Sequence, residues 1–133
     1  TIGDVVDGWG DSFNVVDELL KIPNRIDIMG NHDSWFRTFI NTGIHESSWT
    51  QGALATAKSY AKAAGIDFKY ERQHVGFSEK NLTNVNTFDI PDEHKLFFRR
   101  QNRFYKDEEG NVFVHGGFDK NKPEWYTKFI DTL

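Results

Sequence analysis

Three short motifs carry side chains that can bind a metal ion or transfer a proton. Each follows an apolar segment and contains glycine: Gly3-Asp4-Val5-Val6-Asp7-Gly8, Gly30-Asn31-His32-Asp33 and His115-Gly116-Gly117. Their donor groups are carboxylate, amide and imidazole, and the 133 residues include no cysteine. A metal must therefore be held by oxygen and imidazole nitrogen, a set that suits Mn, Fe, Zn, Ni or Co.

Such a set can act on phosphate esters. Two cations bridged by a carboxylate can polarise a phosphoryl oxygen and generate hydroxide from water. Asp4 is the candidate for the bridging carboxylate, and Asn31 and His115 are candidate neutral metal ligands. His32 would lie on the other side of an extended backbone, facing the leaving group. Asp7 could hydrogen-bond it and favour the imidazolium, which makes His32 a candidate general acid.

Each of these residues also has a purely structural interpretation. Asp4 could be a turn or capping aspartate, Asn31 and His32 could form a Gly-Asn turn, and His115 could be a buried histidine at a sheet end. For Asp33 we favour a structural role, capping the next helix. Other residues lie outside the motifs: His45, His74 and His94 are expected to face solvent, and Trp9 and Trp35 to pack near the mouth of the site.

The motifs need elements that bring them together. Residues 25–29 read as a short strand that ends at Gly30, and residues 1–2 and 111–114 read as two further strand ends. A helix is predicted from residue 11 or 12 to Pro23, and a helix between two strands favours a parallel pair. Ligands collect at the carboxyl ends of strands in an open α/β sheet, so the three motifs are expected to share one space.

The remaining elements are predicted from spacing and capping residues. Helices are expected over residues 34–40 and 51–64, and a third is expected to start within residues 89–93, with proline and acidic residues near its first turn, and to run to about residue 101. Residues 103–106 and 111–114 are expected to form a hairpin. Residues 66–88 lack clear periodicity, and a lid, an insertion or local mobility is expected there.

In this order, the three motifs resemble those of the calcineurin-like metallophosphoesterases, in particular their serine/threonine protein phosphatase-like bacterial and phage members. The resemblance implies an α/β fold, a two-sheet sandwich with helices outside and a dinuclear metal centre. By this similarity Asp4 bridges two divalent metal ions, Asn31 and His115 bind one of them, and His32 paired with Asp7 protonates the leaving group. Residues 1–133 would form one partial domain, with a lid or insertion at 66–90.

The sequence also departs from the family pattern. The Asp-x-His motif expected before Gly3 and the Gly-His motif expected after Leu133 are absent, so the chain is expected to be a fragment, incomplete at both ends, that is inactive or binds metal weakly alone. The arginine that clamps phosphate in the protein phosphatases corresponds here to Gly8. Possible substitutes for it are Arg37, Arg99, Arg100 and Arg103.

Composition narrows the function further. The net charge of −4 gives no basic surface for nucleic acid, and no signal peptide or membrane-spanning segment is evident. The expected protein is a cytoplasmic hydrolase of phosphomonoesters, acting on a phosphoprotein or a small phosphoester by metal-activated hydroxide. The alternative is a non-catalytic binding or scaffold protein that keeps the fold with an incomplete metal site.

Overall fold

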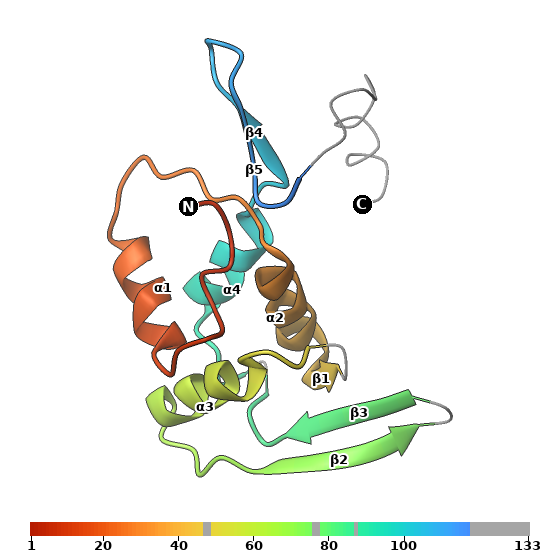
Figure 1. The fold of residues 1–133 in the computed structure, drawn as a ribbon. Coiled ribbons are helices and arrows are strands. Elements are labelled where there is room, and N and C mark those ends of the chain that lie inside the picture. The colour runs from red at the N-terminus through yellow and green to blue at the C-terminus, as the bar shows by residue number, and fades with distance from the viewer. Residues whose placement is uncertain (47–48, 76–77, 87, 118–133) are drawn as a thin grey trace.

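The computed structural model describes residues 1–46, 49–75, 78–86 and 88–117. These residues form four helices and five short strands, a mixed α/β arrangement (Figure 1). The helices are α1 (Ser12–Leu20), α2 (Asn31–Thr42), α3 (Ala53–Ala63) and α4 (Asp92–Arg100). The strands are β1 (Ile44–Glu46), β2 (Tyr70–Val75), β3 (Ser78–Thr83), β4 (Phe104–Lys106) and β5 (Val112–Val114).

Helices α1, α3 and α4 confirm three of the predicted helices. In α4, Asp92 and Glu93 occupy the first turn and Arg99 and Arg100 the last, so that the charges complement the helix dipole. The fourth prediction placed the start of α2 too late. This helix begins at Asn31, because the Asp33 carboxylate in its first turn accepts the N–H of the N-cap residue Gly30 at 2.9 Å.

The core is aromatic and lies between the helices. Phe36 of α2 is fully buried, and its ring packs on Tyr60 of α3 at 4.9 Å and on Phe98 of α4 at 5.0 Å between ring centroids. Trp49, in the connection before α3, is 1% exposed and packs on Phe36 and Phe39 at 5.8 Å. The helices are therefore fixed relative to one another by large rings in contact.

Two antiparallel sheets project from this helical centre in Figure 1. One has the strand order β1-β3-β2, and the other is the predicted hairpin of β4 and β5. The larger sheet contains β2 and β3, which pair from Tyr70↔Thr83 to Val75↔Ser78. Regular strands thus occupy part of the region 66–88, for which the sequence predicted none.

Residues 25–29 do not form the continuous strand that was predicted. Ile28 makes one isolated parallel bridge with Asn102. On its other side, the Thr1 amino group donates to the Ile26 carbonyl at 2.7 Å and the Ile28 N–H to the Thr1 carbonyl at 3.2 Å, a parallel pattern. These bonds hold the segment before Asp4 beside the segment before Asn31.

No helix within the described ranges is long and apolar enough to cross a membrane. The sequence also predicts a helical stretch at the C-terminus, and this stretch lies outside the described residues.

Candidate metal centre and acid pair

The loop that carries Asp4 and Asp7 has an unusual backbone. Asp4 has φ 55° and Asp7 has φ 72°, both in the left-handed region. This conformation costs an L-residue about 1 kcal/mol, although aspartate tolerates it better than most because its short side chain can hydrogen-bond locally. Both residues are therefore held by contacts with other parts of the chain.

Asp33 supplies the contacts for Asp4. The side chain of Asp33 is buried, and its Oδ2 accepts hydrogen bonds from the Asp4 N–H at 2.8 Å and the Gln101 side-chain amide at 3.1 Å. Its Oδ1 accepts the Val5 N–H at 2.9 Å. Burial raises the pKa of the Asp33 carboxyl, and the hydrogen bonds from Gly30, Val5, Asp4 and Gln101 oppose that rise. Asp33 thus has the structural role that the sequence favoured.

Two glycines allow the ligand loops to touch. A Cβ at Gly30 would lie 2.0 Å from Asp4 Oδ1 and 2.5 Å from the Asp4 backbone nitrogen. Gly3 has φ +84°, and a Cβ there would lie 2.5 Å from the Gly30 nitrogen. Real Cβ atoms do not approach other atoms this closely, so each position requires glycine for this approach of the loops.

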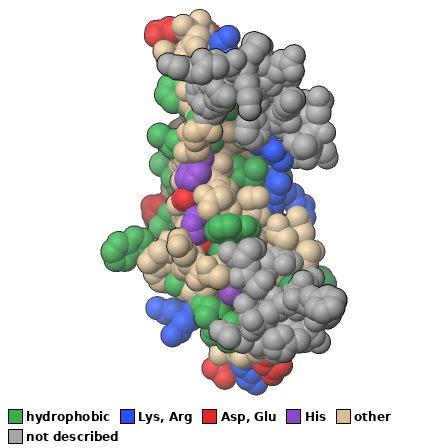
Figure 2. Space-filling view, turned by 45° about the vertical axis from the view of Figure 1, so that its right-hand side comes forward, with side chains coloured by type: hydrophobic (Ala, Val, Ile, Leu, Met, Phe, Trp, Pro, Cys, Tyr) green, Lys and Arg blue, Asp and Glu red, His purple; other side chains and the backbone are tan. Residues whose placement is uncertain are grey.

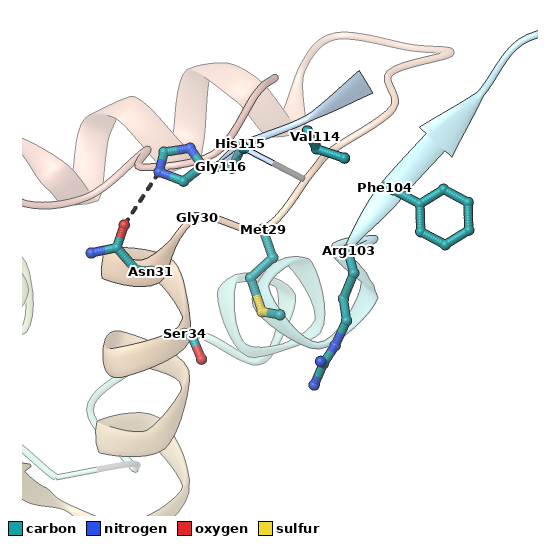
Figure 3. A pocket seen from close by; sticks show the side chains of 10 residues that line it. Met29, Gly30, Asn31, Ser34, Arg103, Phe104, Val114, His115 and Gly116 are labelled. Atoms are coloured by element: carbon teal, nitrogen blue, oxygen red, sulfur yellow. Dashed lines mark hydrogen bonds between the residues drawn. The ribbon is translucent and has the colours of Figure 1, made fainter. Parts of the chain in front are cut away.

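The three predicted metal ligands lie together. His115 Nε2 is 3.0 Å from Asp4 Oδ2 and 3.2 Å from Asn31 Oδ1, and Figure 3 shows the imidazole and the amide facing each other. Asp4 follows the N-terminal segment, Asn31 is the first residue of α2, and His115 directly follows β5. Side chains from three separate segments therefore meet at one point.

The other nitrogen of His115 fixes its chemistry. Nδ1 lies 2.7 Å from the Ile2 carbonyl oxygen, which can only accept, so Nδ1 carries the proton. In the neutral ring, the lone pair of Nε2 then faces the carboxylate oxygen of Asp4 and the amide oxygen of Asn31. These three acceptor atoms face one space, from which all of them could bind a metal ion. The donor set thus fits a metal ion.

His32 and Asp7 form a second pair beside these ligands. His32 Nδ1 donates to Asp7 Oδ2 at 2.6 Å, and the His32 backbone N–H donates to Asp4 Oδ1 at 3.1 Å. The Asp7 side chain is only 2% exposed, whereas that of His32 is 16% exposed. The rings of His32 and Trp35 pack edge to face at 5.0 Å. His32 lies in the first turn of α2, which corrects the prediction of an extended backbone there.

The site is open to solvent. The side chains of His115 and Asp4 are 27% and 32% exposed, and Figure 2 shows histidine and acidic side chains together on one face of the molecule. A cavity of about 260 Å³ adjoins the His32–Asp7 pair. It is lined by Asp4, Val6, Asp7, Gly8, His32, Gln51 and Gly52. A small substrate could therefore reach both the ligands and His32.

Gly8 occupies the position of the arginine that clamps phosphate in the protein phosphatases. The space around it is open, because a Cβ at Gly8 would meet nothing within 4 Å. Arg103 lines a second cavity, of about 360 Å³, with Asn31 and His115. In Figure 3, however, its side chain extends away from those two residues. Arg100 lines a different cavity, next to Arg25 and Leu96. None of these observations selects an arginine for the phosphate.

Two residues that contact Asp7 were missed from sequence. Trp49 donates its indole N–H to Asp7 Oδ2, and Thr56 donates its hydroxyl to Asp7 Oδ1 at 2.5 Å. Trp49 lies in a connection without periodicity, so nothing marked it. Thr56 was detectable, because its spacing from Ala53 and Tyr60 places a polar side chain on the buried face of α3.

Several other expectations were wrong. His45 and His94 are buried rather than solvent-facing, and Trp9 is 84% exposed rather than packed. The side chain of His74 lies outside the described residues. His94 belongs to another group that could hold a metal ion, with Asp17 and Glu93. Its Nε2 bonds Asp17 at 3.0 Å and its Nδ1 bonds the Tyr60 hydroxyl at 2.9 Å, so both nitrogens already have partners.

Comparison of the chain with protein-family models, with curated proteins and with solved structures finds no match.

Proposed function

We propose that this chain carries the catalytic centre of a metal-dependent phosphoesterase that hydrolyses phosphomonoesters. The observation that carries the proposal is the convergence of three acceptor atoms. Asp4 Oδ2 lies 3.0 Å and Asn31 Oδ1 lies 3.2 Å from the third, His115 Nε2. The paired His32 and Asp7 beside them supply a proton donor. The resemblance of the three motifs to the calcineurin-like metallophosphoesterases adds a two-sheet sandwich and a phosphoprotein or small phosphoester as substrate.

The residues have separate roles in this proposal. Asp4, Asn31 and His115 would hold a divalent cation, and Asp4 would also serve a second one. Such cations, when bound, would activate a water molecule and polarise the phosphoryl oxygen. His32 donates a proton from Nε2 to the leaving oxygen, because its Nδ1 proton is bound to Asp7. A chain without cysteine suits a reducing compartment such as the cytoplasm.

Metal binding is the first test. Titration calorimetry with MnCl₂ should give a binding isotherm for the chain, and Asp4→Asn or His115→Gln should weaken the affinity by more than about tenfold. Asp92→Asn is the matched control, since it removes a carboxylate that is 98% exposed and far in sequence from the motifs. Equal affinities in all four proteins would contradict the metal site.

Hydrolysis is the second test. With Mn²⁺ present, the full-length gene product should hydrolyse p-nitrophenyl phosphate, and His32→Ala should lower the rate by about 100-fold while leaving the affinity for Mn²⁺ nearly unchanged. Binding of Mn²⁺ without any hydrolysis would instead favour a non-catalytic metal-binding protein. That alternative has support in the ligand set, because Asp4, Asn31 and His115 together account for one metal position and only one oxygen of a second.

A further inference from the structure

We propose that Thr56 and Trp49 are positioning residues that hold the Asp7 carboxylate in the orientation in which it binds His32. The inference rests on the proposed role of His32 as the proton donor to the leaving group. Neither residue is a candidate to touch substrate. Both act through Asp7, and each binds a different one of its two carboxylate oxygens.

Thr56 holds both the backbone and the side chain of Asp7. Its hydroxyl oxygen accepts the Asp7 N–H at 3.0 Å, and its proton is donated to Asp7 Oδ1 at 2.5 Å. Ser12 Oγ, 3.0 Å away, completes the hydrogen bonding of this buried hydroxyl. Because Asp7 has φ 72°, a left-handed conformation that a free loop would rarely keep, these two bonds together hold the turn.

Trp49 holds the other oxygen. Its indole N–H donates to Asp7 Oδ2, the oxygen that also accepts His32 Nδ1 at 2.6 Å. The indole itself cannot shift easily, since it is 1% exposed and packs against Phe36 and Phe39 in the aromatic core. The position of Oδ2 is thus fixed by a residue of the protein core and not only by the surface loop that carries Asp7.

The consequence concerns the proton of His32. With Oδ1 bonded to Thr56 and Oδ2 bonded to Trp49, the carboxylate cannot rotate about its χ2 angle without losing hydrogen bonds on both sides. Oδ2 therefore stays where it accepts the Nδ1 proton, which leaves Nε2 as the nitrogen that serves the leaving group. Loss of either donor should let the carboxylate rotate and the imidazole lose its fixed orientation.

A leaving-group comparison tests this inference. Phenyl phosphate needs protonation of its leaving oxygen more than p-nitrophenyl phosphate does. Thr56→Val, with Mn²⁺, should lower kcat for phenyl phosphate by about tenfold and kcat for p-nitrophenyl phosphate by less than about twofold. Thr56→Ser keeps the hydroxyl and should restore the ratio. Ser59→Ala is the matched control, because it removes a hydroxyl on the same helix that binds Phe13 N–H at 3.1 Å instead of Asp7.

The ring nitrogens of His32 give a readout without activity. Long-range ¹H–¹⁵N NMR should show the wild-type neutral ring as the Nδ1–H form, and Thr56→Val should show a mixture of the two neutral forms. Trp49→Phe removes the second donor and replaces Thr56→Val if circular dichroism shows that variant unfolded. Hydrolysis of neither ester by the wild type would reject the proposed function alone, and the NMR result would still decide the positioning role. Unchanged ¹⁵N signals in both variants, or equal losses on both esters, would overturn it.

Discussion

The carboxylate of Asp33 joins the two loops that carry the candidate metal ligands Asp4 and Asn31. It accepts hydrogen bonds from backbone groups of both loops, Asp4 and Val5 on one side and Gly30 on the other. Each partner is a donor, so the acceptor must offer lone pairs on both oxygens. An amide of the same shape would place an NH₂ group against at least one N–H, which leaves a buried donor without an acceptor.

The variant Asp33→Asn should therefore be less stable than the wild type by about 2–3 kcal/mol, the size of a charge-assisted hydrogen bond lost in a buried position. Urea denaturation followed by circular dichroism measures this difference in the free energy of unfolding. Asp89→Asn serves as the control, because Asp89 also accepts a backbone N–H, that of Asn86 at 3.1 Å, but in an exposed turn. Similar losses in the two variants would argue against the central role of Asp33.

Among the elements, the N-terminus of α3 is fitted closely to the loop of Asp7. Gly52, which precedes this helix, has φ +76°, and a Cβ there would lie 2.2 Å from the Gly8 nitrogen and 2.7 Å from Asp7 Cβ. This approach is what brings Thr56 within reach of Asp7. Helix α3 is thus built against the loop that carries Asp7.

Gly52→Ala tests this fit at the level of the element. It should cost more than about 2 kcal/mol of unfolding free energy, because the methyl group adds a steric clash to the cost of a left-handed backbone. Gly43→Ala is the matched control: Gly43 ends α2 with φ +70° and has nothing within 4 Å of its Cβ position, so only about 1 kcal/mol should be lost. Chemical denaturation of both variants gives the comparison, and equal costs would refute the close fit.

Element prediction from sequence succeeded where local signals were strong and failed where distant contacts decide. The charged caps of α4 and the turn of the β4–β5 hairpin are local, and both were predicted. The strands β2 and β3 were missed because their residues are mainly polar and give no apolar alternation. His94 was misplaced although it lies three and four positions before the buried Phe97 and Phe98, on the same face of α4.

For the candidate site, too, the sequence showed the residue types but not the distant contacts that position them. The residue types and their order along the chain pointed to Asp4, Asn31, His32 and His115 without any structure. The sequence could not show that Thr56 and Trp49 hold Asp7, because those contacts span 49 and 42 positions and depend on how α3 packs. The start of α2 at Asn31 was also missed, although its signal is local, because Asp33 accepts the N–H of Gly30 only three positions earlier.

In the molecule as a whole, three helices are joined by polar contacts that run from the buried Tyr60 and His94 to the partly exposed Asp17. The Tyr60 hydroxyl of α3 binds His94 of α4 at 2.9 Å, and His94 binds Asp17 of α1 at 3.0 Å. Burial raises the pKa of Tyr60, and the nearby charge of Asp17 adds to the rise. Tyr60 therefore keeps its proton in the folded protein at a pH where it ionises in the unfolded chain.

The sign of this effect predicts alkaline instability. A folded pKa above the unfolded value, about 10 for tyrosine, contributes stability that is complete below pH 10 and is lost as pH rises further. At pH 11 the loss from Tyr60 should be about 1.4 kcal/mol relative to pH 9. Tyr60→Phe should flatten the dependence of unfolding free energy on pH over this range, while its value at pH 7 reports the lost hydrogen bond separately. An unchanged slope in the variant would show that Tyr60 does not cause it.

The partners of Asp33 also set the order in which the molecule can assemble. Its carboxylate joins groups that are 3, 28, 29 and 68 positions away in the chain. The three contacts over 28, 29 and 68 positions require large loops to close, so we expect them to form late in folding. A cation that binds the finished site should then slow unfolding far more than it speeds folding, because it meets its ligands only after the rate-limiting step.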